Sequence, residues 1–254
     1  ATTAALALTL GTGGEMTGMS LNATAHAQQA NQQQFLSAAQ LQSLVSSIAL
    51  YPDSLLSQML MAATYPLEVA EAANWLRGNS HLNSQQMQNA LKNQTWDNSV
   101  KSLVSFPDAL NMLGNKLDWT QQLGNAYLAQ PKDVMQAIQT LRARAKQAGN
   151  LQSNQQIQVT TNPQSEIIIA PTNPQVVYVP AYNPTVVYGA WPYPAYPPYP
   201  VYNPAWGLMS FGLGMAVGAA LWSTPHWGSG SITINGPATP PPETGPVVPA
   251  QVQR

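Results

Sequence analysis

Charge and proline occupy opposite parts of this chain, and that division limits the fold more than any other feature. Only four of the 22 prolines precede residue 163: Pro52, Pro66, Pro107 and Pro131. Beyond Gln147 only three residues carry a charge: Glu166, Glu243 and Arg254. Because proline interrupts a helix beyond its first turn, long helices belong to the front. We therefore predict a mainly α fold, with a multi-helix bundle followed by short β-strands or a ribbon and a Pro/Tyr- and Gly/Trp-rich C-terminal region.

The composition excludes several classes of function. Charged residues make up 7% of the chain, against about 25% in typical proteins, and the net charge is −1. The densest basic group is Arg142, Arg144 and Lys146, which we place in the last turns of a helix, where it suits the helix dipole. No nucleic-acid-binding surface is therefore expected. The absence of cysteine excludes disulfides, thiol nucleophiles and zinc–thiolate sites.

Residues 1–34 have the features of a leader. Ala4–Leu10 is a short apolar run, and Ala25-His26-Ala27 before Gln28 has the small-x-small form of a cleavage site. The segment is either the remnant of a secretory signal, cleaved after Ala27, or a disordered leader. The first reading predicts an exported protein.

Residues 35–152 are predicted to form the α-helical domain, because apolar residues such as Leu41, Leu44, Val45 and Ile48 recur at helical spacing. Each of the four front prolines is followed within two residues by an acid. Proline suits the first helical position, and an acid there meets the positive end of the dipole. This helix start has two forms, one with the acid directly after the proline and one with the acid two residues after it. Each form occurs twice, in the same order, so we hypothesise that 51–83 and 106–153 are a degenerate internal duplication. The alternative is a chance resemblance between helix starts.

No residue pattern in the helical region identifies a reaction. Most acids occupy helix starts, and Glu68 and Glu71, one turn apart, form either a solvated face or a carboxylate pair for acid–base catalysis. His81 and His226 each lack a second metal ligand nearby. Motifs for nucleophilic catalysis, phosphate binding or dinucleotide binding are absent from the sequence. We predict no enzyme activity, no catalytic residue, no metal and no cofactor.

Residues 153–189 are predicted to form short β-strands, at 156–160, 166–169, 176–179 and 186–188, because β-branched and aromatic runs are separated there by Asn-Pro units. Two of these runs lie in the repeat NPQVVYVPAYNPTVVYG (173–189). Proline donates no ladder hydrogen bond, so the strands must be short or lie at an edge.

The last part of the chain is divided into three segments. In the Pro/Tyr segment 190–204, proline at nearly every second position favours an extended polyproline-II conformation, which serves as a semi-rigid spacer or as an aromatic contact surface. The Gly/Trp segment 205–236 contains an uncharged run, 205–222, that forms either a short membrane-associated or self-associating helix or a glycine-rich loop; its end, 231–236, reads as a last strand. Residues 237–254 are predicted to be a disordered tail.

Aromatic and glycine residues of this uncharged half are the candidate binding residues. The candidate contact surface consists of Tyr178, Tyr182, Tyr188, Trp191, Tyr193, Tyr196, Tyr199, Tyr202, Trp206 and Trp222. The candidate residues for helix association are Gly207, Gly214 and Gly218.

Several ordered motifs resemble the bacterial domain-of-unknown-function 3300 family. They are ALYPDSLLSQMLMAATYPLEVAEAANWL (49–76), WDNSVKSLVSFPDAL (96–110), DWTQQLGNAYLAQPKDVMQAIQTLRARAKQAGNL (118–151) and VVYVPAYNPTVVYG (176–189). The resemblance implies an exported bacterial envelope protein with a helical front, and it carries no established activity or functional residue.

We expect a non-enzymatic structural or interaction protein in the periplasm or cell envelope of a Gram-negative bacterium. Its uncharged half would contact membrane, wall polymer or other copies of the chain, with no nucleic acid and no small-molecule cofactor. One alternative is a hydrolase of envelope polymers that uses Asp53, Glu68, Glu71 or Asp118. Another is a periplasmic chaperone or assembly factor, which requires an exposed apolar groove on the helices.

Overall fold

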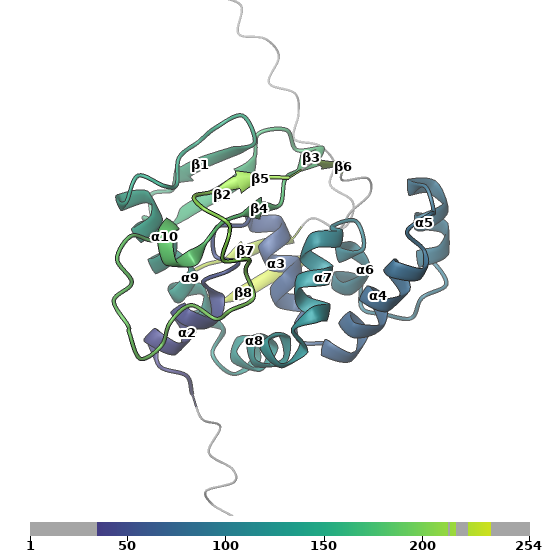
Figure 1. Cartoon of the computed structure of the whole chain (residues 1–254), viewed down its shortest axis with the longest axis horizontal. Helices are drawn as coiled ribbons and strands as arrows, with labels where there is room; N and C mark the ends of the chain where they lie inside the picture. The colour runs from purple at the N-terminus through teal and green to yellow at the C-terminus, as the bar shows by residue number, and fades with distance from the viewer. Residues whose placement is uncertain (1–34, 213, 217–222, 235–254) are drawn as a thin grey trace, which may run out of the picture. The chain divides into compact units, whose positions relative to one another are not determined.

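A computed structural model describes residues 35–212, 214–216 and 223–234 (Figure 1). The leader 1–34, the tail 237–254, Gly218 and Trp222 lie outside the described residues. The described part is mainly α-helical with short antiparallel strand pairs, as predicted at that level.

Helices fill the front of the chain and recur once near its middle. They are α2 (Ala38–Val45), α3 (Asp53–Ala62), α4 (Pro66–Gly78), α5 (Ser84–Leu91), α6 (Asn98–Leu103), α7 (Pro107–Asn115), α8 (Leu117–Ala129), α9 (Pro131–Gln147) and α10 (Pro184–Val187). The predicted proline starts are confirmed, since α4, α7 and α9 carry proline in their first turn and α3 begins directly after Pro52. Reciprocal capping boxes begin α2 (Ser37 with Gln40) and α5 (Asn83 with Gln86).

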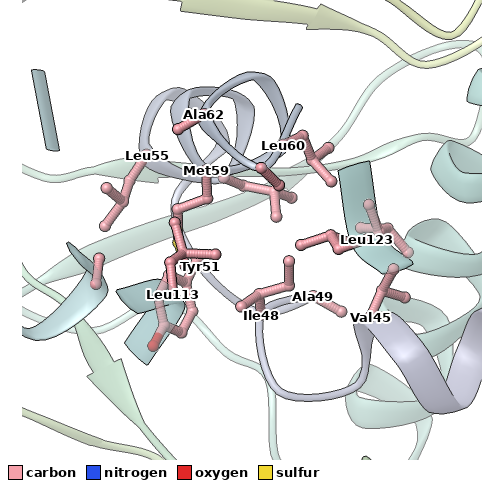
Figure 2. Packing of buried hydrophobic residues seen from close by; sticks show 14 of the residues in the cluster. Val45, Ile48, Ala49, Tyr51, Leu55, Met59, Leu60, Ala62, Leu113 and Leu123 are labelled. Carbon is pink, nitrogen blue, oxygen red and sulfur yellow. The ribbon is translucent and has the colours of Figure 1, made fainter. Parts of the chain in front are cut away.

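The hydrophobic core is centred on the turn between α2 and α3. Figure 2 shows Ile48, Ala49 and Tyr51 of this segment surrounded by side chains of α3 and by Leu113 and Leu123. Helix α8 approaches α3 so closely that a Cβ on Gly124 would lie 2.1 Å from the Ala63 carbonyl oxygen. This contact requires glycine and fixes the distance between the two helices.

Four two-stranded antiparallel sheets occur in the described residues. Their pairs are β1 (Ile157–Thr161) with β2 (Ile167–Pro171), β3 (Val176–Val177) with β6 (Met215–Ala216), β4 (Pro180–Ala181) with β5 (Ser210–Phe211), and β7 (Ser223–His226) with β8 (Ser231–Ile234). In the longest pair Ile157 faces Pro171 and Thr161 faces Ile167. Buried residues of β1, β2 and β3 belong to the same core as the helices.

The predicted strand at 186–188 is wrong, because these residues follow a helix start. Asn183 accepts a hydrogen bond from the Thr185 amide (2.9 Å) and Pro184 occupies the first turn of α10. Asparagine at the cap and proline at the first position are the same helix-start signals that occur in the front. The Asn-Pro unit at 183–184 is therefore a helix start and does not punctuate two strands.

The helix predicted as one alternative for 205–222 is also wrong over its described part. The described residues of this run, 205–212 and 214–216, contain β5 and β6 and no helix. Gly214 lies against β3, where a Cβ would be 2.5 Å from Val176 Cγ1 and 2.8 Å from the Tyr178 ring. No helix within the described ranges has the length and apolar character needed to span a bilayer.

The Pro/Tyr segment 190–204 is anchored along α2 and, through Ser47, on the turn after it, so the interpretation as a semi-rigid spacer is wrong. The Ser43 carbonyl accepts from the Tyr199 amide (3.2 Å), and the Ser43 hydroxyl donates to the Pro197 carbonyl (2.5 Å). At its far end the Asn183 side chain donates to the Pro204 carbonyl (3.2 Å).

The two segments of the hypothesised duplication differ in their elements. Residues 51–83 contain α3 and α4, whereas residues 106–153 contain α7, α8 and α9. The similarity of their helix starts therefore does not extend to the order of the elements.

Candidate functional site

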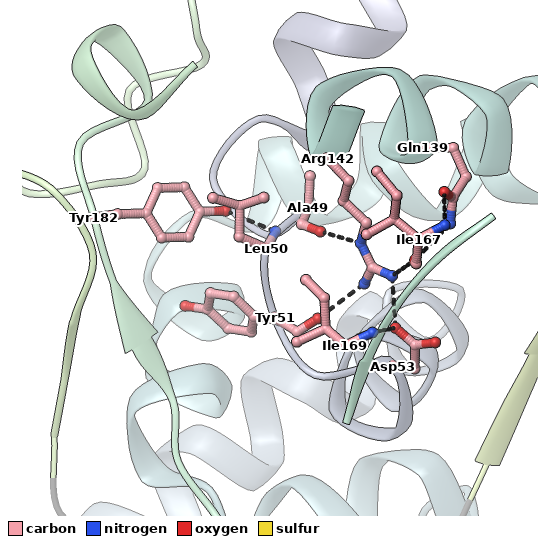
Figure 3. Close-up of polar contacts among 9 residues, drawn as sticks. All are labelled: Ala49, Leu50, Tyr51, Asp53, Gln139, Arg142, Ile167, Ile169 and Tyr182. Carbon is pink, nitrogen blue, oxygen red and sulfur yellow. Dashed lines mark hydrogen bonds and ion pairs between the residues drawn. The ribbon is translucent and has the colours of Figure 1, made fainter. Parts of the chain in front are cut away.

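Arg142 of α9 is fully buried and joins four parts of the chain (Figure 3). Its guanidinium donates to the Ala49 carbonyl (2.8 Å) and the Tyr51 carbonyl (3.0 Å), which belong to the turn before α3. It also donates to the Ile167 carbonyl of β2 (2.8 Å). The ring of Trp227, in the β7–β8 turn, lies 4.7 Å from the guanidinium carbon. The prediction that Arg142 suits the helix dipole missed this role.

Asp53 completes the arrangement around Arg142. Its Oδ1 lies 2.6 Å from Nη1 of Arg142 and accepts the Ile169 amide at 3.2 Å. Burial raises the pKa of the Asp53 carboxyl, while the Arg142 guanidinium and the Ile169 amide act against that rise. Because this carboxylate oxygen is engaged in structural bonds, Asp53 is a poor candidate for a catalytic acid or base.

Two tyrosines of the candidate contact surface are buried in the core. Tyr182 is 1% exposed and Tyr188 2% exposed. Both hydroxyls donate to the Ser46 carbonyl, at 3.0 and 2.5 Å, and the Leu50 amide donates to Tyr182. Burial raises the pKa of both phenols. Assigning Tyr182 and Tyr188 to an outer contact surface was therefore wrong, because they bind the turn after α2.

Six other aromatic residues of the candidate surface remain partly accessible, five of them on the anchored segment 190–204 and one just after it. We call them the aromatic strip, and they are Trp191, Tyr193, Tyr196, Tyr199, Tyr202 and Trp206. Tyr196 is 43% exposed. Trp191 packs at an edge against Tyr193 (6.3 Å between centroids), and its Nε1 donates to the Tyr196 carbonyl (2.9 Å). The guanidinium of Arg144 lies 5.7 Å from the Trp191 ring.

Two further candidate residues lie outside the strip. Tyr178 is half-buried against Phe211 (6.5 Å between ring centroids). Gly207 has no atom within 4 Å of the position that a Cβ would take, so it makes no close approach of the kind expected for helix association.

Three of the four acids proposed for catalysis are engaged in structural bonds, and the fourth is exposed. Glu71 accepts from Trp96 Nε1 (3.1 Å), and Glu68 accepts from the Asp97 amide (2.6 Å), so both hold the segment before α6 on α4. Asp118 is exposed at the start of α8, and His81 is exposed in the loop after α4. Within the described ranges, no three His, Asp or Glu side chains come together as a metal site would require.

A pocket of about 400 Å³ lies between the end of α4, α5, the α6–α7 turn and β6. Its apolar lining residues are Leu76, Leu82, Met87, Val104, Pro107 and Met215. Its polar lining residues are Arg77, Ser80, Ser84, Gln88, Ser105 and Asn111. The sequence did not indicate this pocket, because its walls come from separate segments of ordinary composition and no local motif marks their convergence.

Comparison with known proteins places the chain in a family of unknown function. It is 40% identical over 230 residues to the uncharacterized protein YacH of Escherichia coli (strain K12), covering 75% of this chain and 37% of that protein. The chain thus spans little more than a third of that relative. No solved structure matches it. The family model for the protein of unknown function DUF3300 matches residues 37–239, and the chain belongs to this family.

Proposed function

We propose that this chain is a non-enzymatic interaction protein of the Gram-negative cell envelope, and that it contacts wall polymer through the aromatic strip. The observation that carries the proposal is the strip itself, six partly accessible rings of which five belong to the segment bonded to α2. The uncharged Pro/Tyr and Gly/Trp composition of this half supports it. Support for export comes from the apolar run and cleavage pattern between Ala4 and Gln28.

The fixed backbone favours binding because less conformational entropy is lost on contact. Tyr199 is bonded to α2 through its amide, and Trp191 packs on the buried Tyr188 ring (6.1 Å between centroids). These rings are therefore pre-organised. Tyrosine and tryptophan combine a large apolar face with a polar tip, which suits the C–H faces and hydroxyl groups of sugar rings.

The low charge around the strip favours a neutral polymer over an anionic membrane. Arg144 is the cation that contacts the strip, and it stacks on Trp191 with one N–H donating to the Ala190 carbonyl (3.1 Å). Membrane binding through basic residues normally needs several cations at the surface. Glycan strands are therefore the better partner, with membrane contact and self-association as the competing outcomes.

The two alternative functions have weaker support. A hydrolase needs ionisable groups that converge on substrate, whereas Asp53, Glu68 and Glu71 each bond to a structural partner. A chaperone needs an extended apolar groove, whereas the pocket beside α5 has mixed polar and apolar walls and the volume of a small-ligand site.

Cosedimentation with purified peptidoglycan tests the proposal. We expect the protein to sediment with the polymer, and Tyr196→Ala combined with Tyr202→Ala to weaken binding at least ~10-fold, since each lost ring contact is worth about 1 kcal/mol. Tyr65→Ala is the matched control, because Tyr65 is 39% exposed outside the strip. Binding to vesicles in place of peptidoglycan, concentration-dependent dimers, or equal loss in the control would each contradict the proposal. Fractionation of cells tests the location separately.

A further inference from the structure

The pocket beside α5 has the size and lining of a ligand-binding site. Its volume of about 400 Å³ falls within the range of about 300–1,000 Å³ typical of small-molecule sites. Leu76 and Leu82 approach from the α4 side, Val104 from the α6–α7 turn and Met215 from β6. Segments distant in sequence thus enclose one space with apolar and polar walls, and its lining includes no residue of the aromatic strip.

Helix α5 forms one wall of the pocket without burying a single residue of its own. Its apolar residues Met87, Ala90 and Leu91 share one face, at spacings of three and four, and all three are only half-buried. Met87 and Met215 both line the space, and thioether side chains adapt to varied apolar shapes. Of this face only Met87 is in the lining, so an apolar occupant would complete the burial of Met87.

The polar side of the pocket favours an anion. Among the described residues that line it, Arg77 is the one charged side chain and none is a carboxylate. One guanidinium N–H bonds to Asn74, and the group has five N–H donors. Ser80, Ser84 and Ser105 add hydroxyls. Asp108, the acid in the first turn of α7, is exposed and is not among the lining residues of the pocket.

We propose that this pocket binds an amphiphile with an apolar chain and one anionic head group, of the acyl carboxylate class. The chain lies against Leu82, Met87 and Met215, and the head group pairs with Arg77 at the mouth. The ligand bridges α5 to the α6–α7 turn and thereby orders α5. This proposal is independent of the aromatic strip, so either can fail without the other.

The test uses decanoate below its micelle concentration as the probe, with decanol as its uncharged counterpart. Calorimetry on the whole protein should give saturable, one-to-one binding of decanoate, at least ~10-fold tighter than decanol, because a charge-assisted hydrogen bond is worth about 1.5–3 kcal/mol. Arg77→Gln should remove that difference by weakening decanoate alone. Lys92→Gln is the matched control, since Lys92 is an exposed cation at the end of α5 that bonds to Asn89 and lies outside the pocket lining.

A second variant tests the apolar side without endangering the fold. Met87→Trp fills the space from a helix that has no buried residue, so the circular dichroism spectrum should be unchanged while binding of both probes is lost. Hydrogen exchange of the α5 amides should slow on adding decanoate to the unmodified protein. Absence of saturable binding, or binding unchanged in Met87→Trp, overturns the pocket assignment. Equal affinity for decanoate and decanol overturns the role of Arg77.

Discussion

Replacing Arg142 with methionine should remove a large part of the folding free energy. Methionine keeps an unbranched apolar stem and deletes every donor. The Ala49 and Tyr51 carbonyls would lose the guanidinium N–H groups that bond them, and Asp53 would lose its ion-pair partner.

The expected loss follows from these contacts. Breaking a buried ion pair by removing one partner costs about 3–5 kcal/mol, and each buried acceptor left unpaired adds about 1–3 kcal/mol where water cannot reach it. The Ile167 carbonyl keeps a partner, because Gln139 Nε2 also donates to it (3.1 Å). Asp53 retains some solvent contact (14% exposed), which lowers the cost. We therefore expect a loss of about 5 kcal/mol, the lower end of the sum of these costs, against a total of about 5–15 kcal/mol for a typical domain.

Urea unfolding followed by circular dichroism measures this loss through the midpoint at constant slope. Arg144→Met is the matched control, two residues along the same helix, and should cost about 1 kcal/mol because it removes one cation–π contact. Adding Asp53→Asn to Arg142→Met should recover part of the loss, since no buried charge is then left unpaired. If Arg142→Met cost no more than Arg144→Met, the role given to Arg142 would be refuted.

Three other outcomes follow from the core. The buried tyrosines Tyr51, Tyr182 and Tyr188 have raised pKa values in the folded state. Their contribution to the free energy of unfolding is therefore fully present below about pH 10. It is lost as the pH rises further, by up to ~1.4 kcal/mol per pH unit for each tyrosine. Urea midpoints at a series of alkaline pH values measure this slope. Burial also raises the pKa of Tyr127, so Tyr182→Phe should reduce the slope by about a quarter, and an unchanged slope would contradict the burial of this phenol. Gly124→Ala should cost more than ~3 kcal/mol, beyond the usual range for one substitution, because its Cβ would overlap the Ala63 carbonyl. A thermal melt within the error of the unmodified protein would show that α8 can move away from α3.

The helical front could be predicted because its signals are local. A proline followed by an acid specifies a helix start through neighbouring residues alone, and Pro66, Pro107 and Pro131 each begin a helix. The Asn183-Pro184 unit has the proline and a capping asparagine but no acid after it, and the β-branched residues that follow favour strands. At this position the cap and the proline determined the structure.

Partnerships between distant segments could not be read from the sequence. Arg142 sits near the end of α9, where a cation is also expected for reasons of the helix dipole, and nothing local indicates that its partners are residues 49–53. In sequence, Tyr182 and Tyr188 resemble the partly exposed tyrosines that follow them. What distinguishes them in the structure is that both hydroxyls donate to the Ser46 carbonyl. The pocket likewise depends on where α5 lies relative to β6.

The turn between α2 and α3 has a consequence for synthesis on the ribosome. The hydrogen-bond donors to its carbonyls lie far along the chain. The Ser46 carbonyl accepts from two tyrosines that follow it by 136 and 142 residues. The start of α3 bonds to Ser223 across 169 residues, and α8 bonds to Gly230 across 103. Chains dominated by such long-range contacts fold slowly. The first helices must therefore remain incompletely packed until the β7–β8 hairpin has emerged, so folding finishes only when nearly the whole described chain has been made.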